Sequence, residues 1–323
     1  MNIELADFYS RLGTIAIILV LGFILGKLKM ISPKTNKDLV NLLLMVFMPA
    51  SLFMAFPTTY NDETSHLFVA GLIGGTIVML GIAILATIIF NQKWYKGKFR
   101  YASQFALVFN NATFLGYPII SSTFGAQSSA VIAYCGFIIP FNIALFSYGV
   151  YLFKHKVDGK LIRDVITNPN IIAVVLGVIV FLCSFQIPAF IKDAVQYTSN
   201  ATTALSIICV GYMLSTAKFK QLIKKWRIAV TALIQLIAGP LVTFLLLTAV
   251  KYIAQIGLGI NFPDEVIVVC TLIEALPTAT SLGLFASKYG GDEAEASQLV
   301  TASTLLSIIT MPIMVGLLLG GLI

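Results

Sequence analysis

Two short stretches of the chain combine amide, hydroxyl or carboxyl side chains with a proline, inside long apolar sequence. Their polar residues and prolines are Asn110, Asn111, Thr113 and Pro118 in the first stretch, and Glu274, Pro277, Thr278 and Thr280 in the second. Amide and hydroxyl groups donate hydrogen bonds to carboxylates. A proline removes a backbone donor and disturbs the preceding helical turn. The two stretches therefore predict a binding site for a small anion.

Glu274 is the one acidic residue deep in a predicted membrane span. Placing a charged side chain at the bilayer centre costs about 2.5–3.5 kcal/mol on insertion scales. We therefore expect Glu274 to face a cavity, to carry a proton or to hold a cation. Two interpretations stay open, a proton or sodium coupling site and a neutral acid hydrogen-bonded between helices.

The composition identifies the class of protein that must position these residues. Of 323 residues, 58% are hydrophobic and 11% are charged, whereas soluble chains average about 45–50% and about 25%. So few charges cannot cover a water-soluble globule, and the chain is predicted to be an all-helical polytopic membrane protein. The net charge of +7 is assigned to lysines in cytoplasmic loops, and nucleic acid is not expected as a partner.

A helix needs about 20 apolar residues to cross a bilayer. Ten segments of the chain meet this requirement, and their polar interruptions and prolines place broken helices at the fourth and ninth positions. The predicted spans are 12–28, 38–56, 66–90, 101–124, 129–153, 170–186, 197–216, 227–250, 265–286 and 296–322.

The lysines and arginines orient these spans. All 21 except Arg11, Lys192 and Lys251 fall in the odd-numbered loops. The positive-inside rule places those loops in the cytoplasm, which puts both termini outside a plasma (cell inner) membrane. The richest loop, between helices seven and eight, could also bind anionic membrane lipid. Its basic residues are Lys218, Lys220, Lys224, Lys225 and Arg227.

An internal repeat is indicated by a short motif that occurs twice. Pro33, Lys37, Asp38 and Val40 recur 155 positions later as Pro188, Lys192, Asp193 and Val195. The prolines Pro118 and Pro277 in helices four and nine, and Pro140 and Pro312 in helices five and ten, suggest the same pairing. Five helices per unit require the second unit to be inverted, with units at 1–160 and 161–323. Inverted repeats with broken helices place a binding site at the membrane midplane.

The glycines and cysteines of the predicted spans indicate packing roles. Gly22 with Gly26, and Gly71 with Gly75, form GxxxG pairs that permit close helix packing. The cysteines are expected to be buried free thiols, acting as small apolar groups. They are Cys135, Cys183, Cys209 and Cys270. The sequence contains no metal-ligand spacing and no motif of a soluble enzyme, so we predict neither a cofactor nor an enzyme.

Several pieces together resemble the auxin efflux carrier family, the bacterial relatives of plant PIN proteins. They are Met48-Pro49-Ala50-Ser51-Leu52, Asn111 with Gly116-Tyr117-Pro118, Asn168-Pro169-Asn170, Glu274-Ala275-Leu276-Pro277, and the run from Tyr289-Gly290-Gly291 to Ser303-Thr304-Leu305-Leu306-Ser307 with Pro312. The resemblance implies ten helices with a crossover of helices four and nine. It also implies a scaffold of helices 1, 2, 6 and 7, often a homodimer, and an elevator-like transport domain of helices 3–5 and 8–10.

The resemblance also implies roles for individual residues. Asn111 matches the helix-four asparagine that contacts the substrate carboxylate in the plant proteins. Asn200 matches a second asparagine at the start of helix seven, and Ser51 loosely matches a helix-two serine. The chain departs from the plant pattern in lacking a long loop between helices five and six and in having Glu274. Related bile-acid/sodium symporters place glutamine four residues after such a glutamate, whereas this chain has Thr278.

These observations predict a secondary transporter of a small organic anion, such as a malate-like dicarboxylate, with proton or sodium coupling at Glu274 if any coupling exists. One alternative is a sodium-coupled symporter of larger amphipathic acids. Another is a membrane ligand sensor, although the chain shows no soluble output domain. An intramembrane enzyme would need a nucleophile and base pair or a metal cluster, which the sequence does not offer.

Overall fold

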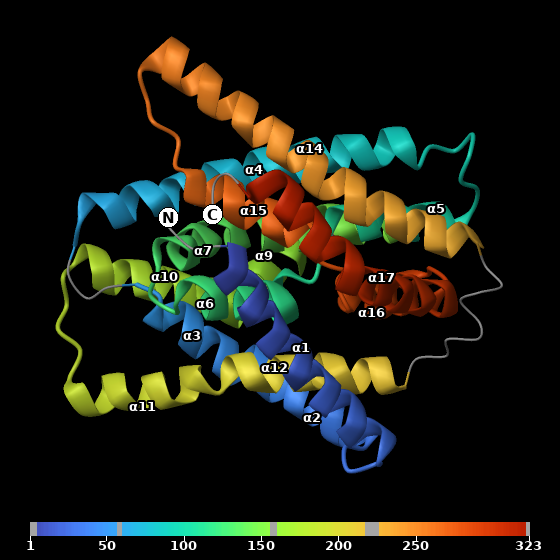
Figure 1. Cartoon of the computed structure of the whole chain (residues 1–323), viewed down its shortest axis with the longest axis horizontal. Coiled ribbons are helices and arrows are strands. Elements are labelled where there is room, and N and C mark those ends of the chain that lie inside the picture. The colour runs from blue at the N-terminus through green and yellow to red at the C-terminus, as the bar shows by residue number, and fades with distance from the viewer. Residues whose placement is uncertain (1–4, 57–59, 156–159, 217–225, 321–323) are drawn as a thin grey trace.

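The computed structural model describes residues 5–56, 60–155, 160–216 and 226–320, and within these ranges the regular secondary structure is helical (Figure 1). Its elements, with π-helical turns written as η, are α1 (Leu5–Lys27), α2 (Pro33–Leu42), η1 (Leu43–Phe47), α3 (Met48–Met54), α4 (Asp62–Ile89), α5 (Lys98–Val108), η2 (Ala112–Gly116), α6 (Tyr117–Phe124), α7 (Ser129–Ala144), η3 (Leu145–Gly149), α8 (Val150–Lys154), α9 (Lys160–Ile166), α10 (Pro169–Leu182), α11 (Ala189–Asn200), α12 (Thr202–Ser215), α14 (Trp226–Leu258), α15 (Asp264–Glu274), α16 (Ser281–Tyr289) and α17 (Glu293–Leu319).

Six helical segments of the described chain are long and apolar enough to cross a membrane. They are Phe8–Lys27, Pro33–Met54, Asp62–Ile89, Ser129–Lys154, Trp226–Leu258 and Glu293–Leu319. The helix α10 is apolar but shorter. Large apolar side chains on many of these helices are exposed, among them Ile17, Leu80 and Ile309. Apolar side chains on the outside are expected of helices that face lipid, so the fold indicates a multi-pass membrane protein.

Two of the π-helical turns lie just before a proline. The turn η1 precedes Pro49 in the first turn of α3, and η2 precedes Pro118 in the first turn of α6. A proline cannot donate to the carbonyl four residues earlier, and a wider turn accommodates the missing bond. The prolines therefore bend these segments without ending them.

Glycines bring two helix pairs into backbone contact. A Cβ atom on Gly22 of α1 or on Gly211 of α12 would collide with the backbone of the other helix. Gly71 of α4 and Gly136 of α7 make the same reciprocal contact. The packing role predicted for the GxxxG glycines Gly22 and Gly71 is confirmed. The pairs α1 with α12 and α4 with α7 are thereby held at the closest approach that helices allow.

The predicted boundaries of the helices around α11 and α14 were wrong. The segment expected to begin at 197 starts at Ala189. The hydropathy pattern missed its first turns because Lys192, Asp193 and Gln196 make this helical stretch polar. The helix α14 extends to Leu258, beyond the predicted end at 250. Lys251 therefore lies in a helix, where its ammonium group pairs with the Asp264 carboxylate at 2.5 Å.

The segments α5–η2–α6 and α15–α16 are each interrupted. Residues 109–111 separate α5 from η2, and residues 275–280 separate α15 from α16. Pro277 lies inside the second interruption, whereas Pro118 lies in α6 beyond the first one. The two prolines thus hold different positions relative to the breaks, and pairing them as repeat equivalents was wrong in register.

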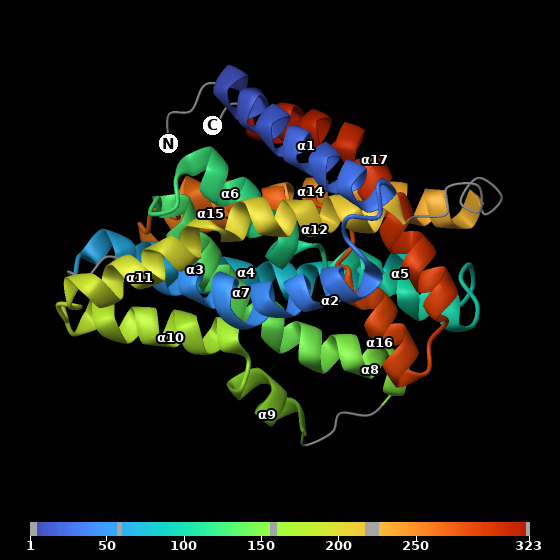
Figure 2. The same cartoon turned by 90° about the horizontal axis from the view of Figure 1, so that it is seen from below.

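The first and last helices pack together near the chain ends, and Figure 2 shows α1 alongside α17. The Tyr9 hydroxyl donates to the Pro312 carbonyl at 3.2 Å. Arg11 donates to the Ser122 carbonyl at 2.6 Å, and this carbonyl belongs to the last turn of α6, where a cation is favoured. The one basic residue of the predicted outer N-terminal region is therefore used to cap α6.

The expected burial of the thiols holds for Cys135, Cys209 and Cys270, but Cys183 is exposed. The error arose because α10 ends at Leu182, earlier than the predicted span. Part of the loop charge on which the orientation rests, Lys156, Lys218, Lys220, Lys224 and Lys225, lies outside the described residues.

Candidate functional site

The two helix interruptions lie against each other. The Asn111 amide donates to the Pro277 carbonyl at 2.7 Å, and the Ala279 amide donates to the Phe109 carbonyl at 2.8 Å. These bonds form an isolated antiparallel bridge between Asn110 and Thr278. Backbone groups freed inside a membrane protein require partners. The two breaks supply partners to each other, which fixes two otherwise distant polar stretches side by side.

Asn110 lies at the centre of a buried network on one side of this bridge. Its Nδ2 donates to Glu274 Oε2 at 2.6 Å, and its Oδ1 accepts from Gln235 Nε2 at 2.6 Å. Gln235, on α14, also donates to the Leu276 carbonyl at 2.7 Å and accepts from Thr278 Oγ1 at 3.2 Å. Each of the four polar side chains is at most 1% exposed. The network ties α14 to both interruptions and removes Asn110 from contact with a ligand in this conformation.

Ser303 extends the network to α17. Its Oγ accepts from the Thr278 backbone amide at 3.1 Å and donates to the Val300 carbonyl at 3.0 Å. The Thr278 amide lies in the interruption, where no helical carbonyl is available to it. A side chain of α17 therefore completes the backbone hydrogen bonding of the second break.

Glu274 is the one carboxyl group of this network, and only one of its oxygens has a partner. Oε2 accepts from Asn110, whereas Oε1 has no hydrogen-bond partner among the described residues. The residue is 1% exposed, and no lysine, arginine or histidine of the described chain pairs with it. A carboxylate with a single donor is costly in an apolar interior. The geometry therefore requires a proton, a cation or a water at Oε1.

Asn111 differs from its neighbour Asn110. Its Oδ1 accepts from the Phe114 amide at 3.2 Å and so caps the helical segment that begins with η2. Its Nδ2 is buried and has no partner in the described part of the chain, and the residue is 3% exposed. Buried amides are nearly always hydrogen-bonded. An unpartnered donor next to the bridge is therefore a candidate contact for a carboxylate.

A cluster of hydroxyl groups joins α3 to the α11–α12 segment. Ser51 Oγ lies 2.6 Å from Thr202 Oγ1 and accepts from Ser199 Oγ at 3.1 Å. Thr202 Oγ1 also donates to the Phe47 carbonyl at 2.9 Å. The Tyr117 hydroxyl of α6 lies close to Ser51 and Ser199. This hydroxyl cluster (Ser51, Ser199, Thr202 and Tyr117) thus spans the contact between α3, α12 and the half-helix that follows Asn111.

The remaining predicted residues lie outside these two groups. Asn200 is exposed and accepts from Gln196 Nε2 at 2.8 Å. Thr113 and Thr280 are half-buried, and the structure shows no side-chain hydrogen bond from either within the described residues. Pro118 and Pro277 are buried. The structure therefore brings Asn110, Glu274 and Thr278 together directly, leaves Asn111 at the first break beside them, and places Ser51 against Ser199 and Thr202.

Five residues of these groups were given no site role from the sequence. Gln235 is an amide in an otherwise apolar predicted span, which is a recognised signal of function. Ser199 and Thr202 flank Asn200 in a polar run, of which the sequence analysis singled out Asn200 alone. Ser303 and Tyr117 lie in stretches that carried the family resemblance without being given a role.

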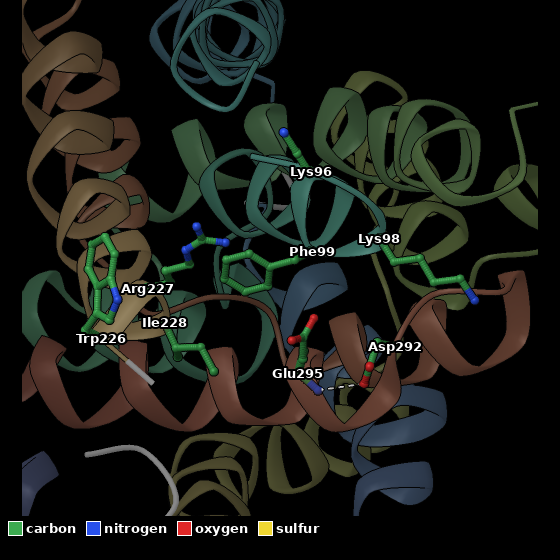
Figure 3. Close-up of a pocket in the computed structure, with 8 residues that line it drawn as sticks. All are labelled: Lys96, Lys98, Phe99, Trp226, Arg227, Ile228, Asp292 and Glu295. Atoms are coloured by element: carbon green, nitrogen blue, oxygen red, sulfur yellow. Dashed lines mark hydrogen bonds between the residues drawn. The ribbon is translucent and has the colours of Figure 1, made fainter. Parts of the chain in front are cut away.

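A cavity of about 430 Å³ lies elsewhere in the described chain (Figure 3). It lies where α5, α14 and α17 begin and is lined by Lys96, Lys98, Phe99, Trp226, Arg227, Ile228, Asp292 and Glu295. Asp292 is used as the cap of α17, accepting from the Glu295 amide at 2.9 Å. The cavity is lined by residues of both charges and by none of the predicted site residues. The candidate site therefore remains at the paired breaks.

A helical multi-pass protein with polar groups gathered at paired helix breaks has the features of a membrane transporter. The model of the membrane transport protein family, which is the auxin efflux carrier family, matches residues 8–162 and 153–315. The chain belongs to this family, as the resemblance indicated.

Curated relatives agree with this assignment. The uncharacterized transporter YfdV of Escherichia coli is 24% identical over 320 residues, covering 96% of this chain and 97% of the relative. The uncharacterized transporter MJ1031 of Methanocaldococcus jannaschii is 24% identical over 212 residues, covering 64% and 68% respectively. The protein is therefore a multi-pass membrane protein of a transporter family.

Proposed function

We propose that the protein is a secondary transporter of a small organic anion that binds beside the paired helix breaks. The observation that carries this proposal is the buried, unpartnered Nδ2 of Asn111. The helical segments starting at Ala112 and Ser281 both begin at the breaks, and helix N-termini favour anions. The hydroxyl cluster around Ser51, formed by residues of α3, α6, α11 and α12, supplies the further donors of the proposed site. A carboxylate is the ligand that these groups suit.

We propose the architecture of ten spans in two inverted units, 1–160 and 161–323. The repeated motif supports it, because Pro33 starts α2 and Pro188 immediately precedes α11. The bond from Thr202 Oγ1 to the Phe47 carbonyl joins residues 155 positions apart, which is the spacing of the motif. A contact between equivalent residues is expected at a pseudo-two-fold axis. The paired breaks form the proposed crossover of helices four and nine.

An elevator-like movement is the proposed mechanism. Helices α1, α2–α3, α10 and α11–α12 would form the scaffold, and the remaining spans would form the moving transport domain. The contacts between the two sets near the site include the Tyr117 hydroxyl of α6 beside Ser51 and Ser199, and the 3.4 Å pair of Ser121 Oγ and Thr203 Oγ1. Hydroxyl pairs of this kind can be exchanged for others at little cost. The tightly packed glycine contacts, in contrast, lie within each set.

Glu274 is the proposed coupling residue, with a proton as the favoured ion. Its Oε1 lacks a partner in the described chain, and the neighbouring side-chain amides already donate to other acceptors. A proton on Oε1 would remove the uncompensated charge. Asn200 and Thr280 are proposed to approach substrate only in another conformation, since neither contacts the site here. A homodimer in the plasma membrane, with both termini outside and lipid at the basic loops, completes the proposal.

The primary test is counterflow of labelled malate in proteoliposomes, which needs no driving force. We expect saturable exchange, with Asn111→Ala weakening the apparent affinity. Asn91→Ala should leave it unchanged, because the half-buried Asn91 side chain bonds only to the backbone of the turn that follows α4. Unaltered affinity in Asn111→Ala would refute the assigned contact. Absence of exchange by folded protein for malate and for a panel of mono- and dicarboxylates would refute the organic-anion proposal.

The coupling role is tested by repeating counterflow and uptake at two pH values, with and without sodium. Glu274→Gln should abolish the pH dependence of concentrative uptake while retaining counterflow. Sodium dependence in the parent protein would favour the alternative of a sodium-coupled symporter. Full pH dependence in the variant would rule out Glu274 as the coupling group.

A further inference from the structure

Two threonines of the packed helices α14 and α15 have no hydrogen-bond partner for their hydroxyl groups in the described chain. They are Thr243 on α14 and Thr271 on α15, and their exposed fractions are 0% and 1%. Other helical threonines of this protein donate to a carbonyl of the preceding turn, as Thr304 does to the Val300 carbonyl at 2.7 Å. The hydroxyls of Thr243 and Thr271 are therefore available to a third group.

The register of the two helices places these threonines opposite each other. At one end of the contact, a Cβ atom on Gly239 would lie 3.3 Å from Glu274 Oε2. At the other end, Lys251 pairs with Asp264. The helices are therefore antiparallel along this length. Thr243 follows Gly239 by about one turn, and Thr271 precedes Glu274 by about one turn, so the two threonines share one level of the contact, about one turn from the level of Glu274.

Three buried oxygens without partners in the described chain are thus carried by the facing helices α14 and α15 within about one turn of each other along the contact, namely Thr243 Oγ1, Thr271 Oγ1 and Glu274 Oε1. A buried water typically makes about three hydrogen bonds to groups that would otherwise be unsatisfied. Two hydroxyls can donate to such a water or accept from it, and a carboxyl oxygen can accept from it or, when protonated, donate to it. The number and chemistry of these groups fit one water molecule.

We propose that Thr243, Thr271 and Glu274 hold a buried water that exchanges the proton of Glu274. In the loading step a hydronium ion at this position transfers one proton to Oε1 of the carboxylate, which leaves a carboxylic acid and a neutral water in place. Unloading reverses the step, with the proton leaving from Oε1. This inference rests on the coupling role proposed for Glu274 and adds the group through which its proton passes.

Among the side chains around the proposed water, Glu274 is the group that would change charge. The facing α14 supplies Gln235 and Thr243, the first break supplies Asn110, and α17 supplies Ser303, none of which titrates at ordinary pH. The titratable groups elsewhere on α15 and on the adjacent α4 and α7 are Cys270, Asp264, Glu265, Asp62, Glu63, His66, Tyr134 and Cys135. Leu247 and Val266, both 0% exposed, separate the proposed water from the Lys251–Asp264 pair. Exchange therefore requires this apolar contact to open.

Infrared difference spectroscopy between two pH values tests the proposal in the purified full-length protein. The carbonyl band of protonated Glu274 is assigned by its loss in Glu274→Gln. In Thr243→Val and Thr271→Val, which keep the side-chain shape, we expect the band to shift to higher wavenumber and its hydrogen–deuterium exchange to slow. The matched control is Thr304→Val, which removes a hydroxyl already bonded within its own helix and should leave the band in place.

An unchanged band position and exchange rate in both threonine variants would overturn the proposal. The proposal would also be overturned if sodium removed the band in the parent protein but not in either threonine variant, because the site would then hold a cation. A pH-independent uptake rate in Glu274→Gln and parent alike would instead reject the coupling role, while the infrared shift would still report the water. The two failures are therefore distinguishable. If a threonine variant does not fold, its serine counterpart, which retains the hydroxyl, must restore the parent spectrum.

Discussion

Gln235 connects both helix breaks to α14, and its removal gives the sharpest test of the polar network. Its amide nitrogen donates to Asn110 Oδ1 at 2.6 Å and to the Leu276 carbonyl at 2.7 Å. In Gln235→Leu these two buried acceptors lose their donor, whereas the Thr278 hydroxyl can rotate to another acceptor. An unsatisfied buried group costs about 1–3 kcal/mol. We therefore expect a loss of about 2–6 kcal/mol of stability.

The assay is thermal unfolding in detergent, in which the reaction of the buried thiols with a thiol reagent gives the midpoint temperature. A shift of about 2 °C per kcal/mol is expected of a chain of this size, which gives a decrease of about 4–12 °C. The matched control is Gln196→Leu, because Gln196 donates to Asn200 at the exposed surface of α11, and such substitutions change stability by about 0.5 kcal/mol or less. Equal midpoints for Gln235→Leu and the control would refute the network as described.

Three further predictions follow from contacts in the structure. Gly211→Val should strongly lower the yield of folded protein, because a side chain there collides with the Leu19 carbonyl of α1; normal yield and unfolding temperature would contradict the packing. Lys251→Met should change stability by no more than about 1 kcal/mol, since its partly exposed ion pair is screened by solvent, and a much larger change in chemical denaturation would show that the pair is structural. Ser51→Ala should weaken substrate affinity in counterflow while changing the free energy of unfolding by no more than about 1 kcal/mol, because Thr202 still donates to the Phe47 carbonyl and Ser199 still lies beside the Tyr117 hydroxyl; an unchanged affinity would exclude Ser51 from the site.

Much of the fold was predictable because the apolar length of a span and the charge of a loop each depend on many residues, so no single residue decides them. The positions of the long helices and the two polar breaks follow from such properties. The start of α11 does not, because a helix with Lys192 and Asp193 on it lacks the continuous apolar run that the prediction used. The register of the two breaks was also beyond reach, since Pro118 and Pro277 occupy different places and only the backbone bridge reveals the alignment.

The site was predictable in its residue types and less so in its connections. Asn110 and Asn111 are adjacent in the chain, and nothing in their order shows that one is held by Glu274 while the other keeps a free amide. That division comes from the extended backbone at the break, which separates the two side chains. Gln235 could be recognised as polar within a span, but its partners lie 125 and 41 positions away and arise only from the packing of α14 against both breaks.

The exposed thiol of Cys183 provides a native reporter at one end of α10, while the other three thiols are buried. A membrane-impermeant maleimide should therefore modify one position on the unaltered protein, without any need to replace the other cysteines. Under the proposed orientation this position faces the outside of the cell, so intact cells and inverted vesicles would label with opposite efficiency. The residue that was misjudged from the sequence thus offers a direct chemical readout of how the chain is inserted.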